Sequence, residues 1–284
     1  MTNANLQTPL AGRVALVTGA NTGIGRVAAR ELARQGAQVF VACRSAERAA
    51  GVLDDIHAVG GRGEFIALDL GDLASVRRCA AEFLGKNLPL HLLINNAGLA
   101  GAHGLTASGF ELAFGTNHIG HFLLTQLLLE RLRTSAPARI VNVSSRAHYR
   151  SPAIDWEALR QPTQSRSGLP EYSVSKLANA LFSAELGRRL AGSGVTTYAL
   201  HPGVVASDVW REVPAPLRWL IKCFMITVEQ GAATTLHCAT SPEAGAQTGL
   251  YYDQCKPRTP SRMAQDAALA AELWRRSEAW VSAN

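Results

Sequence analysis

A tyrosine and a lysine four positions apart, Tyr172 and Lys176, are the pair with the clearest chemical potential in this 284-residue chain. On a helix, residues at i and i+4 lie on the same face, so the two side chains would be neighbours. An ammonium group can lower the pKa of a nearby phenol, which is otherwise about 10. The pair therefore predicts a general acid and base, although the same spacing also occurs by chance on surface helices.

A glycine-rich turn near the start of the chain offers a place for a phosphate. The turn Thr18-Gly19-Ala20-Asn21-Thr22-Gly23-Ile24-Gly25 follows a β-branched run and precedes a helical pattern. Glycines let the backbone approach a pyrophosphate, which would lie at the positive end of the helix dipole. The spacing is Gly-x-x-x-Gly-x-Gly, and simple chain punctuation is the alternative. Its place between a strand and a helix favours dinucleotide binding.

The end of the second predicted strand bears on which dinucleotide binds. A chain that binds NAD usually has Asp or Glu there to hold the adenosine ribose hydroxyls. This chain has Ala42-Cys43-Arg44, without a carboxylate that would repel a 2′-phosphate. Because an arginine can bind a phosphate bidentately, the sequence predicts NADP(H). A solvated surface arginine is the alternative.

Polar residues also follow the third and fourth predicted strands. Asp69 is suited to contact an adenine ring, and Asn95-Asn96-Ala97-Gly98 ends the fourth strand. Ligands of open α/β sheets bind at the carboxyl ends of the strands, so these residues would line the cofactor. Turn formation by Asn and Gly is compatible with that role.

The elements that must position these residues alternate along the whole chain. Short β-branched runs and longer helical patterns predict one doubly wound α/β domain of the Rossmann type over residues 1–284, with a mainly seven-stranded parallel sheet. The expected strands are Val14–Thr18, Gln38–Ala42, Glu64–Leu68, Leu90–Asn95, Arg139–Val143, Val195–Leu200 and Leu250–Tyr252. The expected helices are Ile24–Gln35, Ala46–Val59, Leu73–Leu84, Ser108–Arg133 and Tyr172–Leu190.

Two long segments interrupt this alternation. Arg146–Pro170, rich in Ser, Pro, Gln and Arg, is expected to form a loop with one short helix at most. Pro202–Ile226 contains three prolines and an apolar run. Long irregular segments in compact domains are often binding loops, so residues 203–227 are expected to form the substrate loop. Its aromatic residues fit a substrate pocket and a core position equally well; they are Trp210, Trp219 and Phe224.

The composition allows one large core and argues against several other classes of protein. Of the residues, 47% are hydrophobic, and the net charge of +6 comes from dispersed Lys and Arg, which argues against a nucleic-acid surface. Five cysteines without a Cys-x-x-Cys pair argue against a disulfide framework or a metal site and favour a reducing compartment. No apolar run reaches the roughly 20 residues that cross a bilayer, so a cytoplasmic protein without a transmembrane segment is expected, with residues 1–10 flexible.

Taken together, the motifs resemble those of the short-chain dehydrogenase/reductase family. The resemblance rests on the glycine turn, Asn95-Asn96-Ala97-Gly98, Ser144-Ser145, Tyr172-x-x-x-Lys176 and Pro202-Gly203, and it covers roughly residues 10–280. Within the family the chain looks like the retinol-dehydrogenase-like branch. That likeness is carried by Ala42-Cys43-Arg44, residues 116–122, His201-Pro202-Gly203, residues 249–252, Pro260-Ser261 and Leu273-Trp274.

The resemblance implies a catalytic set of Asn117, Ser145, Tyr172 and Lys176. Tyr172 would protonate a carbonyl oxygen or deprotonate an alcohol, while Lys176 would stabilise the phenolate and bind the nicotinamide ribose. Ser145, the second of two adjacent serines, would hydrogen-bond the substrate oxygen. Asn117 would anchor a water that links Lys176 to solvent. Hydride would pass directly between nicotinamide and substrate carbon.

The same resemblance completes the expected NADP(H) site. Pro202, Gly203 and Val205 match the segment that fixes the nicotinamide carboxamide, and Ser207 stands where the family often has Thr. One departure is the separation of Ser145 and Tyr172 by 27 positions, which is longer than in many family members. The expected cofactor-binding residues are Gly19, Asn21, Thr22, Gly23, Ile24, Gly25, Arg44, Asp69, Leu70, Asn96, Ala97, Gly98, Tyr172, Lys176, Pro202, Gly203, Val205 and Ser207.

The predicted function is that of an NADP(H)-dependent oxidoreductase that interconverts a carbonyl and an alcohol on a small hydrophobic substrate, with retinal as one candidate. The apolar stretch Trp219–Ile226 and the branch resemblance suggest the hydrophobic substrate. A non-catalytic NADP(H)-binding regulator and a C=C reductase of the same family are the alternatives. The resemblance also suggests a homodimer or homotetramer through the helices of Asn117 and Tyr172. Peripheral membrane contact by Trp219–Ile226 stays open.

Several histidines and the C-terminal tail are expected to be structural. His118 and His121 lie three positions apart without a third ligand at a useful spacing, so they are interpreted as helix or interface residues. His201 is expected to pack at a strand end, and Glu272-Leu273-Trp274 to pack in a C-terminal helix.

Overall fold

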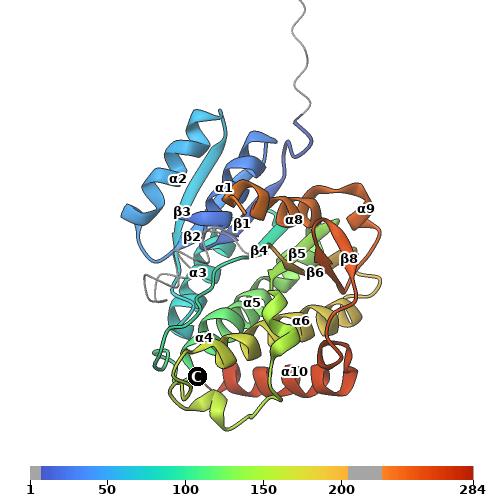
Figure 1. The fold of residues 1–284 in the computed structure, drawn as a ribbon. Coiled ribbons are helices and arrows are strands. Elements are labelled where there is room, and N and C mark those ends of the chain that lie inside the picture. Colours follow the sequence, from blue (N-terminus) through green and yellow to red (C-terminus); the bar gives the residue numbers. More distant parts are fainter. Residues whose placement is uncertain (1–7, 204–225, 284) are drawn as a thin grey trace, which may run out of the picture.

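The computed structural model describes residues 8–203 and 226–283, which share one eight-stranded sheet with helices on both faces (Figure 1). The strands are β1 Val14–Thr18, β2 Gln38–Cys43, β3 Arg62–Ala67, β4 Leu92–Asn95, β5 Ala138–Val143, β6 Val195–His201, β7 Leu250–Asp253 and β8 Lys256–Arg258. Their order across the sheet is β3-β2-β1-β4-β5-β6-β7-β8. All neighbouring strands from β3 to β7 are parallel, and β8 joins the edge antiparallel to β7.

The direction in which successive strands are added to the sheet reverses between β1 and β4, and the functional residues lie near this reversal. From β1 the chain moves outward through β2 and β3, then returns to β4 beside β1 and continues in the other direction. A crevice therefore opens at the carboxyl ends of β1 and β4, which is where open α/β sheets bind ligands. Thr18 ends β1 and Asn95 ends β4 at this crevice.

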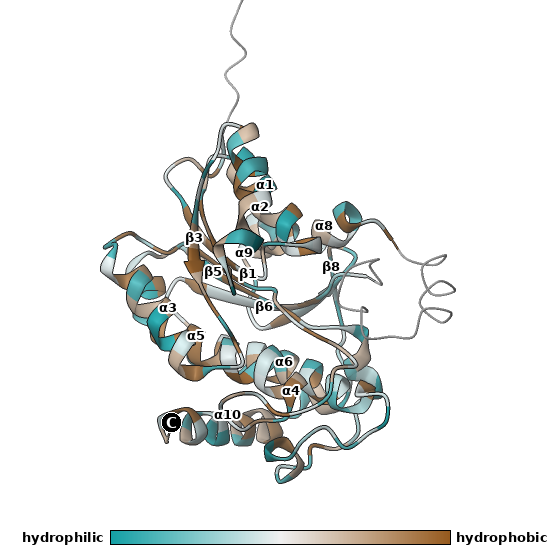
Figure 2. Ribbon diagram, turned by 90° about the vertical axis from the view of Figure 1, so that its left-hand side faces the viewer, coloured by the Kyte–Doolittle hydropathy of each residue, from teal (hydrophilic) through white to brown (hydrophobic). Residues whose placement is uncertain are grey.

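Helices cover both faces of the sheet, as strands that are apolar on both sides require. The helices are α1 Gly23–Arg34, α2 Ala46–Ala58, α3 Leu73–Gly85, α5 Gly120–Thr134, α6 Leu169–Arg189, α8 Val228–Thr240, α9 Pro242–Gly245 and α10 Ala267–Ser282. In β1, Val14 and Leu16 pack with α3, α5 and α6, whereas Ala15 and Val17 pack with α1 and α2. Figure 2 shows the two helix layers on opposite sides of the sheet.

The C-terminal helix α10 lies outside the layer formed by α5 and α6 (Figure 2). Its Trp274 ring lies 5.1 Å from the Phe122 ring on α5 and 5.8 Å from the Phe182 ring on α6, centroid to centroid. The Arg189 guanidinium covers Trp274 at 4.3 Å from the ring centroid. The expected C-terminal helix is therefore confirmed, and the chain itself covers this face of α5 and α6.

The seven predicted parallel strands are confirmed to within two residues at each end, but the eighth strand was not predicted. Lys256, Pro257 and Arg258 carry no β-branched or aromatic residue that would mark a strand. They pair with β7 through a tight turn in which Gln254 and Cys255 both have positive φ, the conformation of a two-residue hairpin. This exposed edge strand is fixed by its turn rather than by burial.

The predicted helix over Ser108–Arg133 is confirmed from Leu112 onward, but its first four residues are not helical and a π-helical turn lies within it. The segment contains the short helix α4 Leu112–Phe114 and a π-helical turn η1 Gly115–Ile119 before α5 begins at Gly120. A Cβ on Gly120 would lie 2.4 Å from the Leu70 carbonyl oxygen, so the backbones touch here. The helix therefore continues through a wider turn at Asn117 and packs closely against residue 70, neither of which the apolar pattern predicted.

Several predictions concern residues beyond the described ranges. Val205, Ser207, Trp210, Trp219 and Phe224 all fall in the segment 204–225. Of the N-terminal residues expected to be flexible, 1–7 also fall outside, whereas the Leu10 amide donates to the Gln35 carbonyl. Among the helices of residues 8–203 and 226–283, none has the length and apolar character to cross a membrane.

Candidate active site

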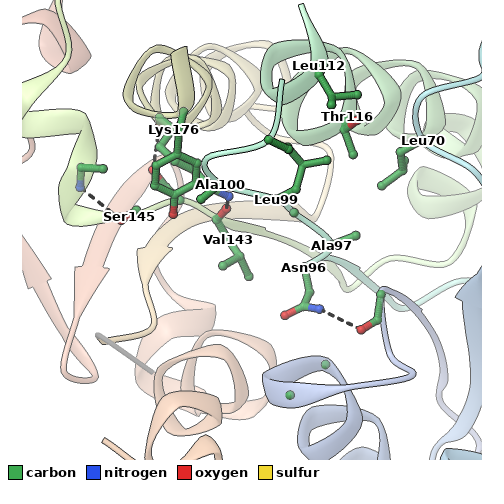
Figure 3. A pocket seen from close by; sticks show the side chains of 18 of the residues that line it. Leu70, Asn96, Ala97, Leu99, Ala100, Leu112, Thr116, Val143, Ser145 and Lys176 are labelled. Atoms are coloured by element: carbon green, nitrogen blue, oxygen red, sulfur yellow. Dashed lines mark hydrogen bonds between the residues drawn. The ribbon is translucent and has the colours of Figure 1, made fainter. Parts of the chain in front are cut away.

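A cavity of about 1470 Å³ lies at the carboxyl ends of β1, β2, β4 and β5 (Figure 3). The glycine turn and Arg44 line one part of it, and Ser145, Tyr172 and Lys176 line another. The structure thus brings most of the predicted cofactor residues and three of the four predicted catalytic side chains to one cavity. The expected cofactor residues that line it are Gly19, Asn21, Thr22, Gly23, Ile24, Gly25, Arg44, Asp69, Leu70, Asn96, Ala97, Gly98, Tyr172, Lys176, Pro202 and Gly203.

Tyr172 and Lys176 lie side by side on α6, as their spacing predicts. The Lys176 Nζ is 5.6 Å from the centroid of the Tyr172 ring, and it donates a hydrogen bond of 2.9 Å to the Val143 carbonyl at the end of β5. Tyr172 is 7% exposed and Lys176 only 3%. The lysine is therefore anchored to the sheet while its remaining N–H groups stay available.

Burial dominates the ionisation of this pair. It lowers the pKa of Lys176 to about 8, because a charged ammonium is poorly solvated there. Burial also raises the pKa of the Tyr172 phenol, and a hydrogen bond with the Ser145 side chain offsets part of that increase. The expected lowering of the Tyr172 pKa is thus not found for the protein's own residues, because burial raises it.

The two adjacent serines at the end of β5 make different contacts. The Ser144 hydroxyl donates to the Lys176 carbonyl at 2.6 Å and so holds α6 against the sheet. The Ser145 hydroxyl lines the cavity and accepts from the Ala147 amide at 3.1 Å, which begins the short 3₁₀ helix η2 Arg146–Arg150. Because its oxygen already accepts, the Ser145 O–H remains to donate towards Tyr172 or a ligand.

Asn117 lies behind the cavity wall in the π-helical turn and is fully buried. Its side-chain oxygen accepts from the Leu99 amide at 2.9 Å, and its side-chain nitrogen donates to the Leu99 carbonyl and to the Ser175 hydroxyl. A Cβ on Gly98 would lie 3.2 Å from the Asn117 Oδ1 and 3.3 Å from the Lys176 Nζ. Asn117 therefore borders Lys176 across Gly98, and its side chain holds the loop after β4.

Thr18 and His121 connect this region to the glycine turn. The His121 Nδ1 lies 2.9 Å from the Asn117 carbonyl, so it carries the proton, and the Thr18 hydroxyl then donates to Nε2 at 2.8 Å. The Thr18 oxygen accepts from the amides of Asn96 and Ala97. Burial lowers the pKa of His121 to about 4, which keeps this arrangement neutral. Sequence reasoning missed Thr18, although its place at the end of β1 marked it.

The residues of the glycine turn fit a pyrophosphate. Within residues 8–203 and 226–283, no side chain caps the first turn of α1, which contains no acidic residue, so its amide groups face the cavity without a partner there. A Cβ on Gly25 would lie 2.4 Å from both the Asn96 Nδ2 and the Gly19 carbonyl oxygen. Only glycine permits this close approach, which keeps the turn packed against the end of β4.

Two arginines at the end of β2 face the cavity and form no ion pair within the described residues. Arg44 follows β2, and Arg48 lies four positions later in the first turn of α2; both are exposed. Arg26, in contrast, is held by Asp55 at 2.6 and 2.9 Å and by the Gly51 carbonyl. Sequence reasoning missed Arg48, which its i+4 spacing from Arg44 could have revealed.

The remaining cofactor predictions have mixed outcomes. Asp69 lines the cavity, but its Oδ1 accepts from the Gly71 amide, so it also forms the turn after β3. Gly203 lines the cavity with a φ of 95°, which favours glycine. The residues Leu99, Ala100, Leu105, Leu112 and Leu169 line the cavity and were not singled out from the sequence.

The long segment before Tyr172 is folded against the cavity rim, with two 3₁₀ helices, η2 and η3 Ala158–Arg160, where one short helix at most was expected. Two carboxylates hold it. Glu111 accepts from the Thr163 hydroxyl, and Glu171 accepts from the amide and hydroxyl of Ser165.

The histidines expected to be structural are buried in packed surroundings. The His118 ring lies 5.2 Å from the Phe114 ring and 3.2 Å from the Ser277 hydroxyl on α10. His201, at the end of β6, is 4% exposed, and its Nδ1 accepts from the Arg146 amide. Among residues 8–203 and 226–283, no cluster of His, Cys, Asp and Glu could hold a metal ion.

The chain is similar to known dehydrogenases over nearly its whole length. A family model described as short chain dehydrogenase matches residues 13–158. Human retinol dehydrogenase 11 is 46% identical over 270 residues, which cover 93% of this chain and 84% of that protein. These similarities confirm the resemblance to the retinol-dehydrogenase-like branch.

Solved structures give the same result. A crystal structure of a protein from Mycobacterium paratuberculosis aligns with a TM-score of 0.78 at 38% identity, covering 96% of this chain and 94% of that one. A short chain dehydrogenase from Burkholderia cenocepacia in complex with NADP aligns with a TM-score of 0.70 at 26% identity, covering 86% and 97%. The chain therefore belongs to the short-chain dehydrogenase/reductase family, whose members are oxidoreductases that use NAD(P)(H).

Proposed function

We propose that this protein is an NADP(H)-dependent oxidoreductase that interconverts a carbonyl and an alcohol on a small hydrophobic substrate. One observation carries the proposal. Ser145, Tyr172 and Lys176 converge on the same cavity that the glycine turn, Arg44 and Arg48 line. An acid/base group, an oxyanion donor and a dinucleotide site in one cavity are the parts that this reaction needs.

Each side chain has a role that follows from its surroundings. Tyr172 transfers a proton to or from the substrate oxygen, and the Ser145 O–H donates to the same oxygen as its charge develops. Lys176 stabilises the phenolate through its charge, and burial in a low-dielectric site strengthens that interaction. Asn117 lies next to Lys176 across Gly98. Its main-chain carbonyl oxygen already accepts from His121 Nδ1, and the second lone pair of that oxygen would anchor a water that returns the proton to solvent.

The cofactor supplies or accepts the hydride when it is bound. The first-turn amides of α1 would hold its pyrophosphate, since no side chain in the described part of the chain caps them. Arg44 and Arg48 would hold the 2′-phosphate, because both residues line the cavity and neither forms an ion pair in the described residues. This pair of cations is the reason to favour NADP(H) over NAD(H).

An apolar wall supports a hydrophobic substrate. Leu99 and Ala100 line the cavity near Lys176, while Leu112 and Thr116 line it closer to Leu70 (Figure 3). Three large apolar side chains at its rim are exposed: Leu105 at 43%, Leu169 at 41% and Tyr149 at 48%. Exposed apolar groups that gather at a cavity mark a binding site. The relatives named retinol dehydrogenase agree with this class, and retinal is one candidate.

The test is the Tyr172→Phe variant with a panel of retinal, nonanal and glyceraldehyde. Because the phenol is the proton donor, turnover with NADPH should fall ~10²-fold or more while NADPH binding persists. Tyr198→Phe is the matched control, since that buried tyrosine donates to the Ala244 carbonyl far from the cavity. Turnover by Tyr172→Phe equal to that of the control would refute the mechanism.

The panel also separates the alternatives. A non-catalytic regulator would bind NADPH but consume none with any aldehyde. With retinal, whose aldehyde is conjugated to C=C bonds, a C=C reductase would consume NADPH and return an aldehyde with one C=C bond reduced, whereas the proposed enzyme would return the allylic alcohol. Faster turnover of glyceraldehyde than of nonanal would contradict the hydrophobic substrate class.

A further inference from the structure

We propose that His148 is the positioning residue that orients Ser145 for reaction, an inference that rests on the proposed role of Ser145. His148 follows Ser145 by three positions in η2 and is fully buried. It does not line the cavity, whereas its neighbours Ala147 and Tyr149 do. It stands directly behind the serine that faces the substrate.

Both ring nitrogens of His148 have partners that fix the tautomer. The Nδ1 lies 2.6 Å from the Ser145 carbonyl, which can only accept, so Nδ1 carries the proton. The Nε2 lies 3.1 Å from the Ser261 amide, which can only donate, so Nε2 carries the lone pair. The neutral imidazole therefore connects the main chain of Ser145 to the C-terminal tail in one defined orientation.

The C-terminal segment that contains Ser261 is itself held in place by hydrogen bonds and packing. The Ser261 hydroxyl accepts from the Ala264 amide, at the turn that leads into α10, whose Leu273 and Trp274 are buried in the core. The Tyr149 hydroxyl donates to the Thr259 carbonyl as a second link between the same two segments.

Ring contacts hold the imidazole in place from the sides. The Tyr149 and Tyr251 rings lie 4.1 and 4.8 Å from the His148 ring, centroid to centroid. Arg146, at the start of η2, is paired with Asp253 on β7 at 2.7 Å. The segment that carries Ser145 is thus fixed to parts of the chain that follow it by about a hundred residues.

The hydrogen bonds around Ser145 explain how orientation reaches its hydroxyl. The Ser145 carbonyl accepts twice from His148, from its amide at 3.1 Å and from its Nδ1. The Ser145 Oγ accepts from the Ala147 amide, within the same turn. Fixing the carbonyl therefore fixes the turn, and the turn directs the hydroxyl oxygen so that its proton points into the cavity.

Two variants test the two ring nitrogens of His148 separately. In His148→Asn, the side-chain amide can take the place of Nδ1–H and donate to the Ser145 carbonyl. In His148→Gln, the amide oxygen can take the place of Nε2 and accept from the Ser261 amide. If His148 orients Ser145, the His148→Gln variant should have a kcat about tenfold lower and an unchanged dissociation constant for NADPH. The His148→Asn variant should keep kcat within about threefold of the unmodified protein.

The experiment measures kcat and KM for nonanal and NADPH, NADPH binding and the melting temperature of both variants, alone and combined with Ser145→Ala. With Ser145 removed, His148→Gln should lower kcat no further, because the two residues act as one unit. Equal losses in Asn and Gln, or the same loss with and without Ser145, would overturn the inference. If Ser145→Ala itself keeps full turnover, the proposed role of Ser145 fails and this inference fails with it.

Discussion

Replacing Arg44 by alanine should convert a strong preference for NADPH into a weak one. Arg44 is exposed and without an ion pair in the described residues, so its guanidinium can reach a 2′-phosphate without first breaking another contact. Hydrogen bonds to charged groups contribute about 1.5–3 kcal/mol, and an exposed site calls for the lower part of that range. A loss of about 1.5–2 kcal/mol corresponds to roughly 10- to 30-fold weaker NADPH binding.

The assay is the dissociation constant of NADPH and of NADH, measured by nucleotide fluorescence at low and high salt. NADH lacks the 2′-phosphate, so its affinity should stay within about twofold in Arg44→Ala, and the additional replacement Arg48→Ala should remove the remaining discrimination. The NADPH preference should shrink at 1 M salt, where the Debye length is only about 3 Å.

Arg133→Ala is the matched control, because Arg133 is 43% exposed on α5 and lies outside the cavity lining. It should leave both dissociation constants unchanged. Two results would refute the reasoning about the end of β2: a preference of the unmodified protein for NADH, or an equal loss of NADPH and NADH binding in Arg44→Ala.

Two further variants test the buried lysine and the glycine turn. Because burial lowers the pKa of Lys176 to about 8, below its unfolded value of 10.5, the charged form destabilises the fold below pH 8, and this effect fades as the pH rises towards 10.5. Lys176→Met should therefore abolish turnover yet raise the unfolding free energy at pH 7 by about 1–3 kcal/mol, since Asn179 still donates to the Val143 carbonyl. Denaturant titration should show that this gain in stability becomes smaller above pH 8. A loss of stability at pH 7 would contradict the reasoning. Gly25→Ala should weaken NADPH binding at least tenfold because its Cβ would collide with Asn96 and Gly19, whereas Gly85→Ala, with open space around it, should leave binding unchanged.

Local patterns were sufficient for the strands and for the placement of most site residues. The β-branched runs specified seven parallel strands, because their apolar character on both faces fits only a sheet covered by helices. The positions of Arg44, Asn96 and Ser145 at strand ends then placed them at one edge, since parallel strands end together. The spacing of Tyr172 and Lys176 placed both on one helix face.

Sequence patterns did not predict the structure correctly where it depends on contacts between distant segments. The apolar pattern over Ser108–Arg133 correctly suggested a helix, but it did not show the π-helical turn at Asn117 or the close approach of Gly120 to Leu70. β8 formed because of a tight turn with positive φ at Gln254 and Cys255, which the sequence of the strand itself does not announce. The expectation of a dimer through the helices of Asn117 and Tyr172 stays a prediction, and α10 already covers Phe122 and Phe182 on those helices.

The sequence by itself determined seven parallel strands and the residue types at their carboxyl ends, because these depend on periodicity and on spacing along the chain. Only the tertiary structure decided the ionisation of Tyr172 and Lys176, since the direction of each pKa shift depends on burial that the spacing does not show. The tertiary structure also decided that Arg26 is held by Asp55 while Arg44 and Arg48 face the cavity. Likewise, it joined His148 to Ser261 behind Ser145, because a contact across 113 positions exists only once the tail has packed against the core.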